Sequence, residues 1–339
     1  MSAPDPIETA RTLVAGGRGI LAADESTGTI TKRFQAVGID STADTRRAYR
    51  ELLLTAPGVS EFISGVILYD ETIRQTASDG TPFPDMIKER GIIPGIKVDT
   101  GAKVLAKAPD EKVTEGLDGL RERITEYVEM GARFAKWRAV ITIGEGIPSD
   151  YCIHTNAHAL ARYAALCQEG GLAPIVEPEA LIDGDHTIEQ CFEATERTLR
   201  AVFAELAIQR VSLEGMVLKP NMVIAGKQCP KQASVQEVAE QTIRCLRFTV
   251  PAAVPGVAFL SGGQTPQQAT AHLDAMSRMG PHPWQITFSY ARALQDAAMR
   301  SWKGDRSKVG TAQQAFYARA QLVSLARRGS YTAEMEEAA

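Results

Sequence analysis

The sequence predicts an α/β protein that folds as a single (β/α)8 barrel, the TIM-barrel architecture. Apolar runs of strand length alternate with amphipathic stretches, and most runs lie roughly 40 residues apart, the length of one strand–loop–helix unit. The expected strands are residues 20–23, 63–69, 92–98, 134–140, 174–177, 216–218, 257–260 and 284–288. Residues 188–206 and 235–248 have helical periodicity with charged outer positions.

A doubly wound sheet is the alternative architecture. That fold usually has a glycine-rich phosphate turn after its first strand, and neither G-x-G-x-x-G nor G-x-x-x-x-G-K-[ST] occurs in the chain. No linker is long enough to divide the sequence. We therefore expect one barrel domain over residues 1–339, with a short N-terminal segment 1–8 and a C-terminal tail 330–339.

Composition excludes several classes of partner. An apolar fraction of 44% and a charged fraction of 23% are typical of a soluble globular enzyme. A net charge of −4 argues against a nucleic-acid or membrane-surface partner, because both require a basic face. No apolar run reaches membrane-spanning length, and the first residues carry acids and prolines where a signal peptide would be basic and apolar. We expect a cytoplasmic protein.

Cysteine and histidine spacing gives no metal site. The five cysteines form no CxxC pair and no zinc-ligand spacing, which fits reduced thiols in a cytosolic compartment. His154 and His158 have the spacing of two ligands on one helix face, but Thr155 stands where a zincin has its glutamate. We interpret both histidines as polar helix residues and expect neither a metal nor a cofactor.

The run 216–218 ends in a lysine, Lys219, followed by Pro220. An ammonium at the end of a buried strand is unfavourable unless it is paired or its pKa falls. A lysine kept neutral can form a Schiff base with a carbonyl substrate. The alternative is a strand-terminal lysine that extends to solvent.

Six of the other seven predicted strands also end in reactive residues. In a (β/α)8 enzyme the active site lies at the carboxyl ends of the strands. The residues at these ends include Asp24 and Ser26, Lys97, Lys136 and Arg138, Glu177 and Glu179, Ser261 to Gly263, and Ser289 to Arg292. One such residue could be a solvated loop charge, but seven of the eight runs ending this way is hard to explain as surface chemistry.

Strand alternation predicts a charge cluster in the barrel. Lys136 and Arg138 share one face of their strand, and Glu177 and Glu179 share one face of the next. Two cations would then oppose two carboxylates, with Lys219 one strand further on. The cluster is either an ion-pair layer that stabilises the barrel or a proton-relay site, and spacing leaves both open.

Two groups of anion-binding residues face each other across the predicted barrel mouth. The loops after the seventh and eighth strands, which often hold a phosphate in this fold, supply small residues, the hydroxyls of Ser261 and Ser289, and Arg292. The opposite group consists of Ser26, Thr29, Arg33 and Lys97. Two such sites on either side of a lysine predict a bis-phosphorylated substrate.

The chain resembles the class I, metal-independent fructose-bisphosphate aldolases from about residue 7 to about residue 331. The resemblance rests on several motifs taken together and in order. They are GILAADESTG (19–28), GIKVD (95–99), FAKWR (134–138), IVEPE (175–179), LKPNM (218–222), LSGGQ (260–264) and TFSY (287–290).

The resemblance implies a role for each matching residue. Lys219 would form the iminium, Asp24 would take the proton of the C4 hydroxyl, and Glu177 would act as general acid and base. Lys136 and Glu179 would balance charge and orient the others. The phosphate on the dihydroxyacetone half would meet Ser261, Gly262, Gly263, Ser289, Ala291 and Arg292. The other phosphate would meet Ser26, Thr29, Arg33 and Lys97, with Arg138 a further substrate-binding residue. A homotetramer of glycolysis and gluconeogenesis is implied as well.

Three positions depart from the family pattern. Ala291 stands where glycine is usual, and a left-handed backbone there would cost alanine roughly 1–2 kcal/mol. Thr29 replaces serine and keeps the hydroxyl. The long tail with a terminal tyrosine, known in animal members, is absent from this sequence; Tyr331 is not terminal, and we do not expect it to replace that residue.

Two other functions compete with this hypothesis. A Schiff-base relative such as a transaldolase or a deoxyribose-phosphate aldolase would need only one phosphate site, and two are expected here. A barrel retained as a binding or scaffold protein would not be expected to keep Lys219, Glu177, Asp24 and Lys136 intact. The preference among fructose 1,6-bisphosphate, fructose 1-phosphate and sedoheptulose 1,7-bisphosphate stays open.

Overall fold

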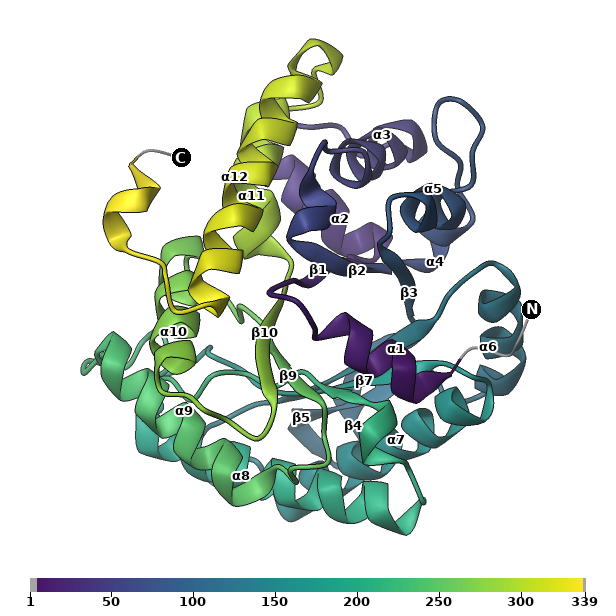
Figure 1. The fold of residues 1–339 in the computed structure, drawn as a ribbon. Helices are drawn as coiled ribbons and strands as arrows, with labels where there is room; N and C mark the ends of the chain where they lie inside the picture. The colour runs from purple at the N-terminus through teal and green to yellow at the C-terminus, as the bar shows by residue number, and fades with distance from the viewer. Residues whose placement is uncertain (1–4, 338–339) are drawn as a thin grey trace.

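The computed structural model describes residues 5–337 and contains a closed barrel of eight parallel strands (Figure 1). Around the barrel the strands follow one another in chain order, and the last pairs with the first. They are β1 (Gly19–Ala23), β2 (Ile63–Leu68), β3 (Ile93–Lys97), β6 (Phe134–Ile141), β7 (Ala173–Ala180), β8 (Val217–Leu218), β9 (Gly256–Phe259) and β10 (Gln285–Tyr290). Each coincides with a predicted run, so the predicted (β/α)8 barrel is confirmed.

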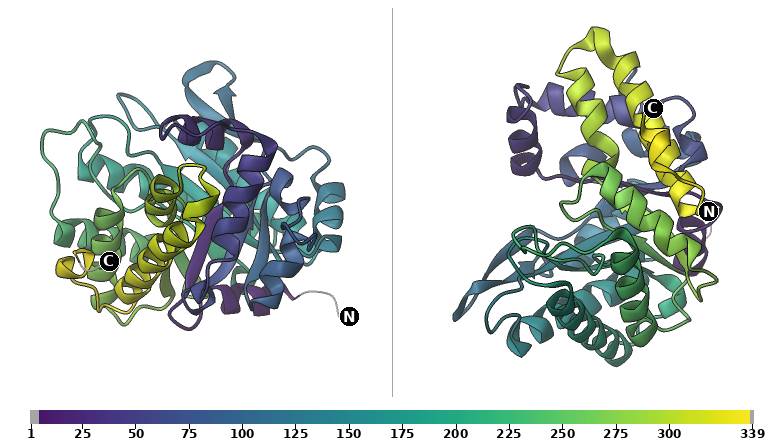
Figure 2. Two further views of the ribbon diagram at one scale, coloured as in Figure 1. Left: turned by 90° about the horizontal axis from the view of Figure 1, so that it is seen from above. Right: turned by 90° about the vertical axis from the view of Figure 1, so that its left-hand side faces the viewer.

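Helices surround the barrel and connect successive strands (Figures 1 and 2). The predicted helices at 188–206 and 235–248 are confirmed as α8 (Ile188–Ile208) and α9 (Val235–Thr249). The others are α1 (Pro6–Leu13), α2 (Thr27–Gln35), α3 (Ala43–Leu54), α4 (Asp70–Ile73), α5 (Phe83–Glu89), α6 (Leu120–Glu129), α7 (Asp150–Glu169), α10 (Pro266–Arg278), α11 (Arg292–Trp302) and α12 (Val309–Arg327). Within residues 5–337, no helix is long and apolar enough to cross a membrane.

Helix starts follow local capping chemistry. At α8 the Thr187 hydroxyl accepts the Gln190 N–H while the Gln190 side chain accepts the Thr187 N–H, which satisfies two donors that the helix leaves unpaired. Thr265 and Gln268 repeat this arrangement at α10, directly after the loop that follows β9. Capping therefore fixes where the loops at the carboxyl ends of the strands stop.

Helix α1 closes the amino-terminal end of the barrel (Figure 1). Its Leu13 packs into the interior cluster that contains Ile20, Phe134 and Ile175. The Phe134 ring fits there only because residue 95 is glycine, since a Cβ on Gly95 would lie 2.3 Å from the ring. Because apolar side chains fill the barrel interior at this end, a cavity can open only at the other end.

The segments outside the barrel differ in part from the expected division of the chain. The structure begins α1 at Pro6, inside the predicted segment 1–8, and forms a short 3-10 turn, Ala333–Glu336, in the predicted tail. Residues 1–4 and 338–339 lie outside the described residues. The division into one domain with two flanking segments stays a prediction.

A two-stranded antiparallel hairpin was not predicted. It consists of β4 (Gly101–Leu105) and β5 (Ala108–Glu115), placed between β3 and α6, and it projects from the barrel (Figure 2). Most of its residues are exposed, so the apolar runs that mark the barrel strands are missing here. The Thr114 hydroxyl donates to the Arg138 carbonyl at 2.7 Å and attaches the hairpin to the neighbouring barrel strand.

Arg327, near the end of α12, connects three segments at the closed end of the barrel. Its buried guanidinium donates to the carbonyl oxygens of Val14, Ala15, Arg18 and Ile286. Among residues 5–337 it forms no ion pair with a carboxylate. The arginine therefore acts as a multiple hydrogen-bond donor that joins α12 to β10 and to the loop between α1 and β1.

We expect Arg327→Met to lower the free energy of unfolding by about 2–4 kcal/mol, because buried carbonyl groups lose their donors. Urea unfolding followed by circular dichroism measures the difference. The exposed neighbour offers a matched control, and Arg328→Met should change stability by less than about 0.5 kcal/mol. Equal losses in the two variants would contradict this assignment.

Candidate active site

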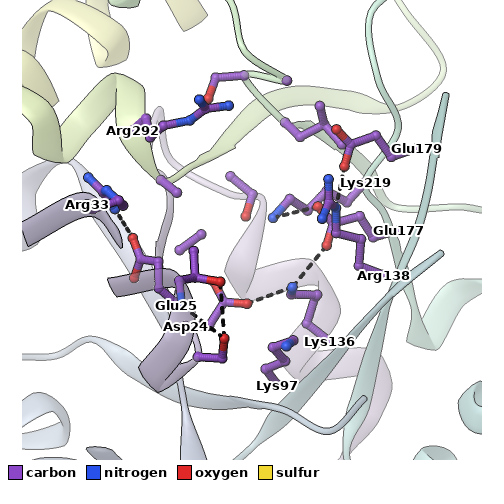
Figure 3. Close-up of a pocket in the computed structure, with 18 of the residues that line it drawn as sticks. Asp24, Glu25, Arg33, Lys97, Lys136, Arg138, Glu177, Glu179, Lys219 and Arg292 are labelled. Carbon is purple, nitrogen blue, oxygen red and sulfur yellow. Dashed lines mark hydrogen bonds and ion pairs between the residues drawn. The ribbon is translucent and has the colours of Figure 1, made fainter. Parts of the chain in front are cut away.

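A cavity of about 390 Å³ opens at the carboxyl ends of the barrel strands. Its lining contains all the predicted site residues except Gly263 (Figure 3). The lining residues are Ala22, Asp24, Glu25, Ser26, Thr29, Lys32, Arg33, Lys97, Lys136, Arg138, Glu177, Glu179, Lys219, Leu260, Ser261, Gly262, Ser289, Ala291 and Arg292. A Cβ on Gly263 would lie 2.8 Å from Lys227 Nζ, so this glycine faces Lys227 and does not line the cavity.

Four buried charges form a continuous chain in the centre of the cavity (Figure 3). Lys219 Nζ lies 3.1 Å from Glu177 Oε1, and Glu177 Oε2 lies 3.2 Å from Lys136 Nζ. Lys136 Nζ in turn lies 2.6 Å from Asp24 Oδ2. Two cations and two carboxylates alternate, so each charge meets the opposite sign and the cluster is neutral.

The electrostatics of this chain keep both carboxylates ionised. Burial by itself would raise the pKa of Asp24, but the charges of Lys136 and Lys219 outweigh it and hold the pKa well below its usual value. The pKa of Glu177 is lowered by the same balance, burial being opposed by Lys136, Lys219 and Arg138. Burial opposes the charged form of Lys136, yet Asp24 and Glu177 raise its pKa above the ordinary range.

Strand register accounts for this arrangement. Lys136 of β6 lies beside Lys97 of β3 in the ladder, and Arg138 lies beside Glu177 of β7. The ion pairs do not follow the ladder. The Arg138 guanidinium bonds to Glu179, and Glu177 pairs with Lys136 and Lys219. The predicted arrangement, in which Lys136 and Arg138 face two carboxylates, is therefore present. Which cation pairs with which carboxylate depends on how far each side chain extends.

One end of the cavity gathers donors suited to an anion. Ser261 and Gly262 come from the loop after β9, and Arg292 begins α11, whose N-terminus has no side-chain cap. The buried Ser289 hydroxyl has no hydrogen-bond partner among the described residues. Ala291 has φ −101°, so the left-handed backbone that would strain alanine does not occur there.

The opposite end holds the second predicted anion group. Ser26 caps α2 by accepting the Thr29 N–H, and its hydroxyl lies 3.1 Å from that of Thr29. The Lys97 ammonium lies 3.2 Å from Asp99. Arg33 lines the cavity, but its guanidinium also bonds to Glu25 and, at 2.9 Å, to Asp296.

Sequence reasoning missed the network that holds Arg33. Glu25 accepts from Arg33 and forms an ion pair at 2.7 Å with the buried Arg50. Burial alone would raise the pKa of this carboxyl, but both arginines outweigh it and lower the pKa. Gln295 accepts from Arg33 and donates to the Ala22 carbonyl at 2.6 Å. Glu25 could have been noticed beside Asp24, but nothing in the sequence brings α3 and α11 to β1.

The residues set aside from the sequence lie apart from the cavity. His154 and His158 are exposed on α7, where one contacts the Asp150 carbonyl and the other Glu205. Tyr331 is buried but does not line the cavity, and its hydroxyl donates to Glu336 at 2.9 Å.

Comparison with known proteins gives one family. A family model described as glycolytic fructose-bisphosphate aldolase class-I matches residues 5–339. A probable fructose-bisphosphate aldolase class 1 of Xanthomonas campestris pv. campestris is 60% identical over 332 residues, which cover 98% of this chain and 99% of that protein. The cytosolic fructose-bisphosphate aldolase 4 of Arabidopsis thaliana is 51% identical over 321 residues, 94% of this chain and 82% of that protein.

A solved structure agrees with these sequence matches. Fructose-bisphosphate aldolase from Plasmodium falciparum, in complex with TRAP and a small-molecule inhibitor, superposes with a TM-score of 0.95 at 47% identity. The match covers 98% of this chain and 99% of that chain, so the similarity extends over essentially the whole barrel.

We expect Lys136→Met to raise the pKa of Asp24, because burial then acts on this carboxyl against less opposing charge. A carboxyl whose folded pKa exceeds its unfolded value of 3.8 favours folding at low pH and opposes it as the pH rises. The variant should therefore lose about 3–5 kcal/mol of stability at about pH 7 and less at about pH 5.

Urea unfolding of both proteins at the two pH values measures this difference. Lys88→Met, at an exposed lysine on α5, should cost less than about 0.5 kcal/mol at either pH. A loss for the Lys136 variant that is the same at both pH values would contradict the electrostatic coupling to Asp24.

Proposed function

The chain belongs to the class I fructose-bisphosphate aldolase family and is a lyase, and we propose that Lys219 forms the Schiff base of its reaction. Class I members cleave fructose 1,6-bisphosphate reversibly to dihydroxyacetone phosphate and glyceraldehyde 3-phosphate. The observation that carries the residue assignment is the buried chain of Lys219, Glu177, Lys136 and Asp24 inside the cavity. The Lys219 amine lies within hydrogen-bond distance of the Glu177 carboxylate, a group that can transfer protons.

Formation of the Schiff base begins with attack of Lys219 Nζ on the C2 carbonyl of the ketose. The ionised Glu177 carboxylate, 3.1 Å from this nitrogen, first takes the proton whose loss leaves Lys219 a free amine. It then returns that proton to the carbinolamine hydroxyl, which departs as water and leaves an iminium. Lys136 balances the charge of Glu177 while the proton moves. Glu179, which is held by Arg138 on the same face of β7, is assigned to balance charge and orient Glu177.

Cleavage of the C3–C4 bond requires a base at one end and an electron sink at the other. Asp24, ionised because Lys136 and Lys219 outweigh its burial and lower its pKa, accepts the proton of the C4 hydroxyl. The C3–C4 electron pair passes into the iminium and forms an enamine, while the aldehyde product departs. A proton from solvent then adds to C3 while Asp24 returns its proton to solvent, and addition of water at C2 releases the ketone product and free Lys219.

The two ends of the cavity support a substrate with two phosphates. Ser261, Gly262, Ser289 and the backbone of Ala291 with Arg292 form the end that we assign to the phosphate of the dihydroxyacetone half. We assign Ser26, Thr29 and Lys97 to the other phosphate. Arg33 adds a guanidinium beside them, and this group also bonds to Glu25 and Asp296.

Assembly and location are further parts of the proposal. We propose a homotetramer of one barrel domain per chain, acting in the cytoplasm in glycolysis and gluconeogenesis. The family description is glycolytic, and the two Arabidopsis thaliana relatives, aldolases 4 and 6, are described as cytosolic. Sedimentation velocity of the purified protein tests the assembly.

Borohydride reduction with dihydroxyacetone phosphate and EDTA should leave a stable secondary amine on Lys219, because hydride adds to the iminium carbon. Peptide mass spectrometry locates the modified residue. Lys219→Met should give no adduct, whereas Lys227→Met, at an exposed lysine, should be labelled as wild type. An adduct on a different lysine, or no adduct in a protein inactivated by the chelator, would refute the assignment.

Single substitutions at the two ends of the cavity should separate the two phosphates. Arg292→Met should raise the KM for both fructose 1,6-bisphosphate and fructose 1-phosphate by about tenfold or more, the size of one charge-assisted hydrogen bond. Lys97→Met should raise the KM for the bisphosphate alone. Steady-state kinetics with both ketoses decides, and an equal effect of Lys97→Met on both substrates would contradict the assignment.

A further inference from the structure

Asn221 joins the ends of the two strands that carry the proposed Schiff-base lysine and its proton-transfer carboxylate. It lies two residues after Lys219, is buried, and accepts the Ala180 backbone N–H on Oδ1 at 2.9 Å. Ala180 is the last residue of β7, the strand of Glu177 and Glu179. A side-chain amide thus connects β7 to the segment after β8.

This connection replaces a hydrogen bond that Pro178 prevents. The ladder between β7 and β8 ends with the Lys219 N–H donating to the Val176 carbonyl at 2.8 Å. In a parallel ladder the next donor on β7 towards β8 would be residue 178, but Pro178 has no N–H. Pro220 faces β9 instead, since its carbonyl accepts the Leu260 N–H at 3.2 Å. Without Asn221, the carboxyl end of β7 would have no hydrogen bond to the Lys219 segment.

The amide is itself held on the side away from Ala180. Its Nδ2 donates to the Thr195 hydroxyl of α8 at 3.1 Å and to the Met222 carbonyl at 3.0 Å. Because an N–H can bond only to the oxygen of the amide, these contacts fix its orientation. All of these groups are buried, so water does not compete for them.

We propose that Asn221, held by Thr195, is a positioning residue that keeps Glu177 within proton-transfer distance of Lys219. The proposal rests on the proposed roles of those two residues. Asn221 lines neither end of the cavity and contacts no substrate atom in this assignment. Its effect is on the relative position of two strand ends, and displacements of about 1 Å in such sites lower rates by about 100-fold.

Three threonine variants on α8 test the proposal with little change in volume. Thr195→Val removes the hydroxyl that holds Asn221, while Thr195→Ser keeps it. Thr198→Val is the matched control, because Thr198 is also buried on α8 and its hydroxyl has no partner among the described residues. Asn221→Ala removes the amide itself. Each variant is measured for thermal unfolding, for kcat and KM with fructose 1,6-bisphosphate, and for the pH profile of kcat.

We expect Thr195→Val to lower kcat by about three- to tenfold and Asn221→Ala by about 10- to 100-fold, with KM changed less than about twofold. The acid limb of the kcat profile should move to higher pH, since Glu177 loses part of the cationic contact that lowers its pKa. Thr195→Ser and Thr198→Val should stay within about twofold of wild type in both measurements.

The proposal is overturned if folded Thr195→Val and Asn221→Ala keep the wild-type kcat and pH profile, even where their melting temperatures fall. It is also overturned if Thr198→Val loses as much activity as Thr195→Val. Should Asn221→Ala fail to fold, the three threonine variants decide alone. Failure of the proposed function is distinguishable, because wild type itself would then give no turnover and no adduct on Lys219.

Discussion

The structure depends on one buried cation, Lys136, which lies between two buried carboxylates. Without it, Asp24 and Glu177 would face each other and Lys219 in a cavity where burial disfavours ionised carboxyl groups. With it, charges of opposite sign alternate from Asp24 to Lys219, and burial becomes tolerable. The same ion pairs that compensate for burial keep the carboxylates ionised and in contact with Lys219, so under the proposed function one cluster serves both as an ion-pair layer and as a proton relay.

Such a cluster needs strand ends that do not move relative to one another. The barrel is closed, its amino-terminal end is filled by α1, and Arg327 fastens α12 to that end through carbonyl groups. At the opposite end the cavity opens, and Pro178 ends the ladder between β7 and β8 because it has no N–H to donate. Side-chain hydrogen bonds, that of Asn221 above all, take over where backbone pairing stops.

The anion-binding ends illustrate how backbone and side chain share a function. At the end near α11, small residues, an uncapped helix start and an unpartnered hydroxyl leave donors available to a ligand. At the end near α2, Arg33 is already bonded to carboxylates. The two ends therefore differ in how much of their charge is available, a difference that a substrate with two phosphates would encounter on entering.

The sequence by itself determined the barrel and nearly all of the cavity lining. Apolar runs of strand length mark buried parallel strands, and the end of a strand in this fold is where reactive groups collect, so position along the chain sufficed to predict Lys219, Glu177 and Asp24. The exposed hairpin was missed because its strands lack such runs. Tertiary structure alone decided that Glu25 meets Arg33 and Arg50, that Arg138 pairs with Glu179, and that Ala291 is unstrained. These outcomes depend on side-chain reach and backbone angles between elements distant in sequence, which no local pattern encodes.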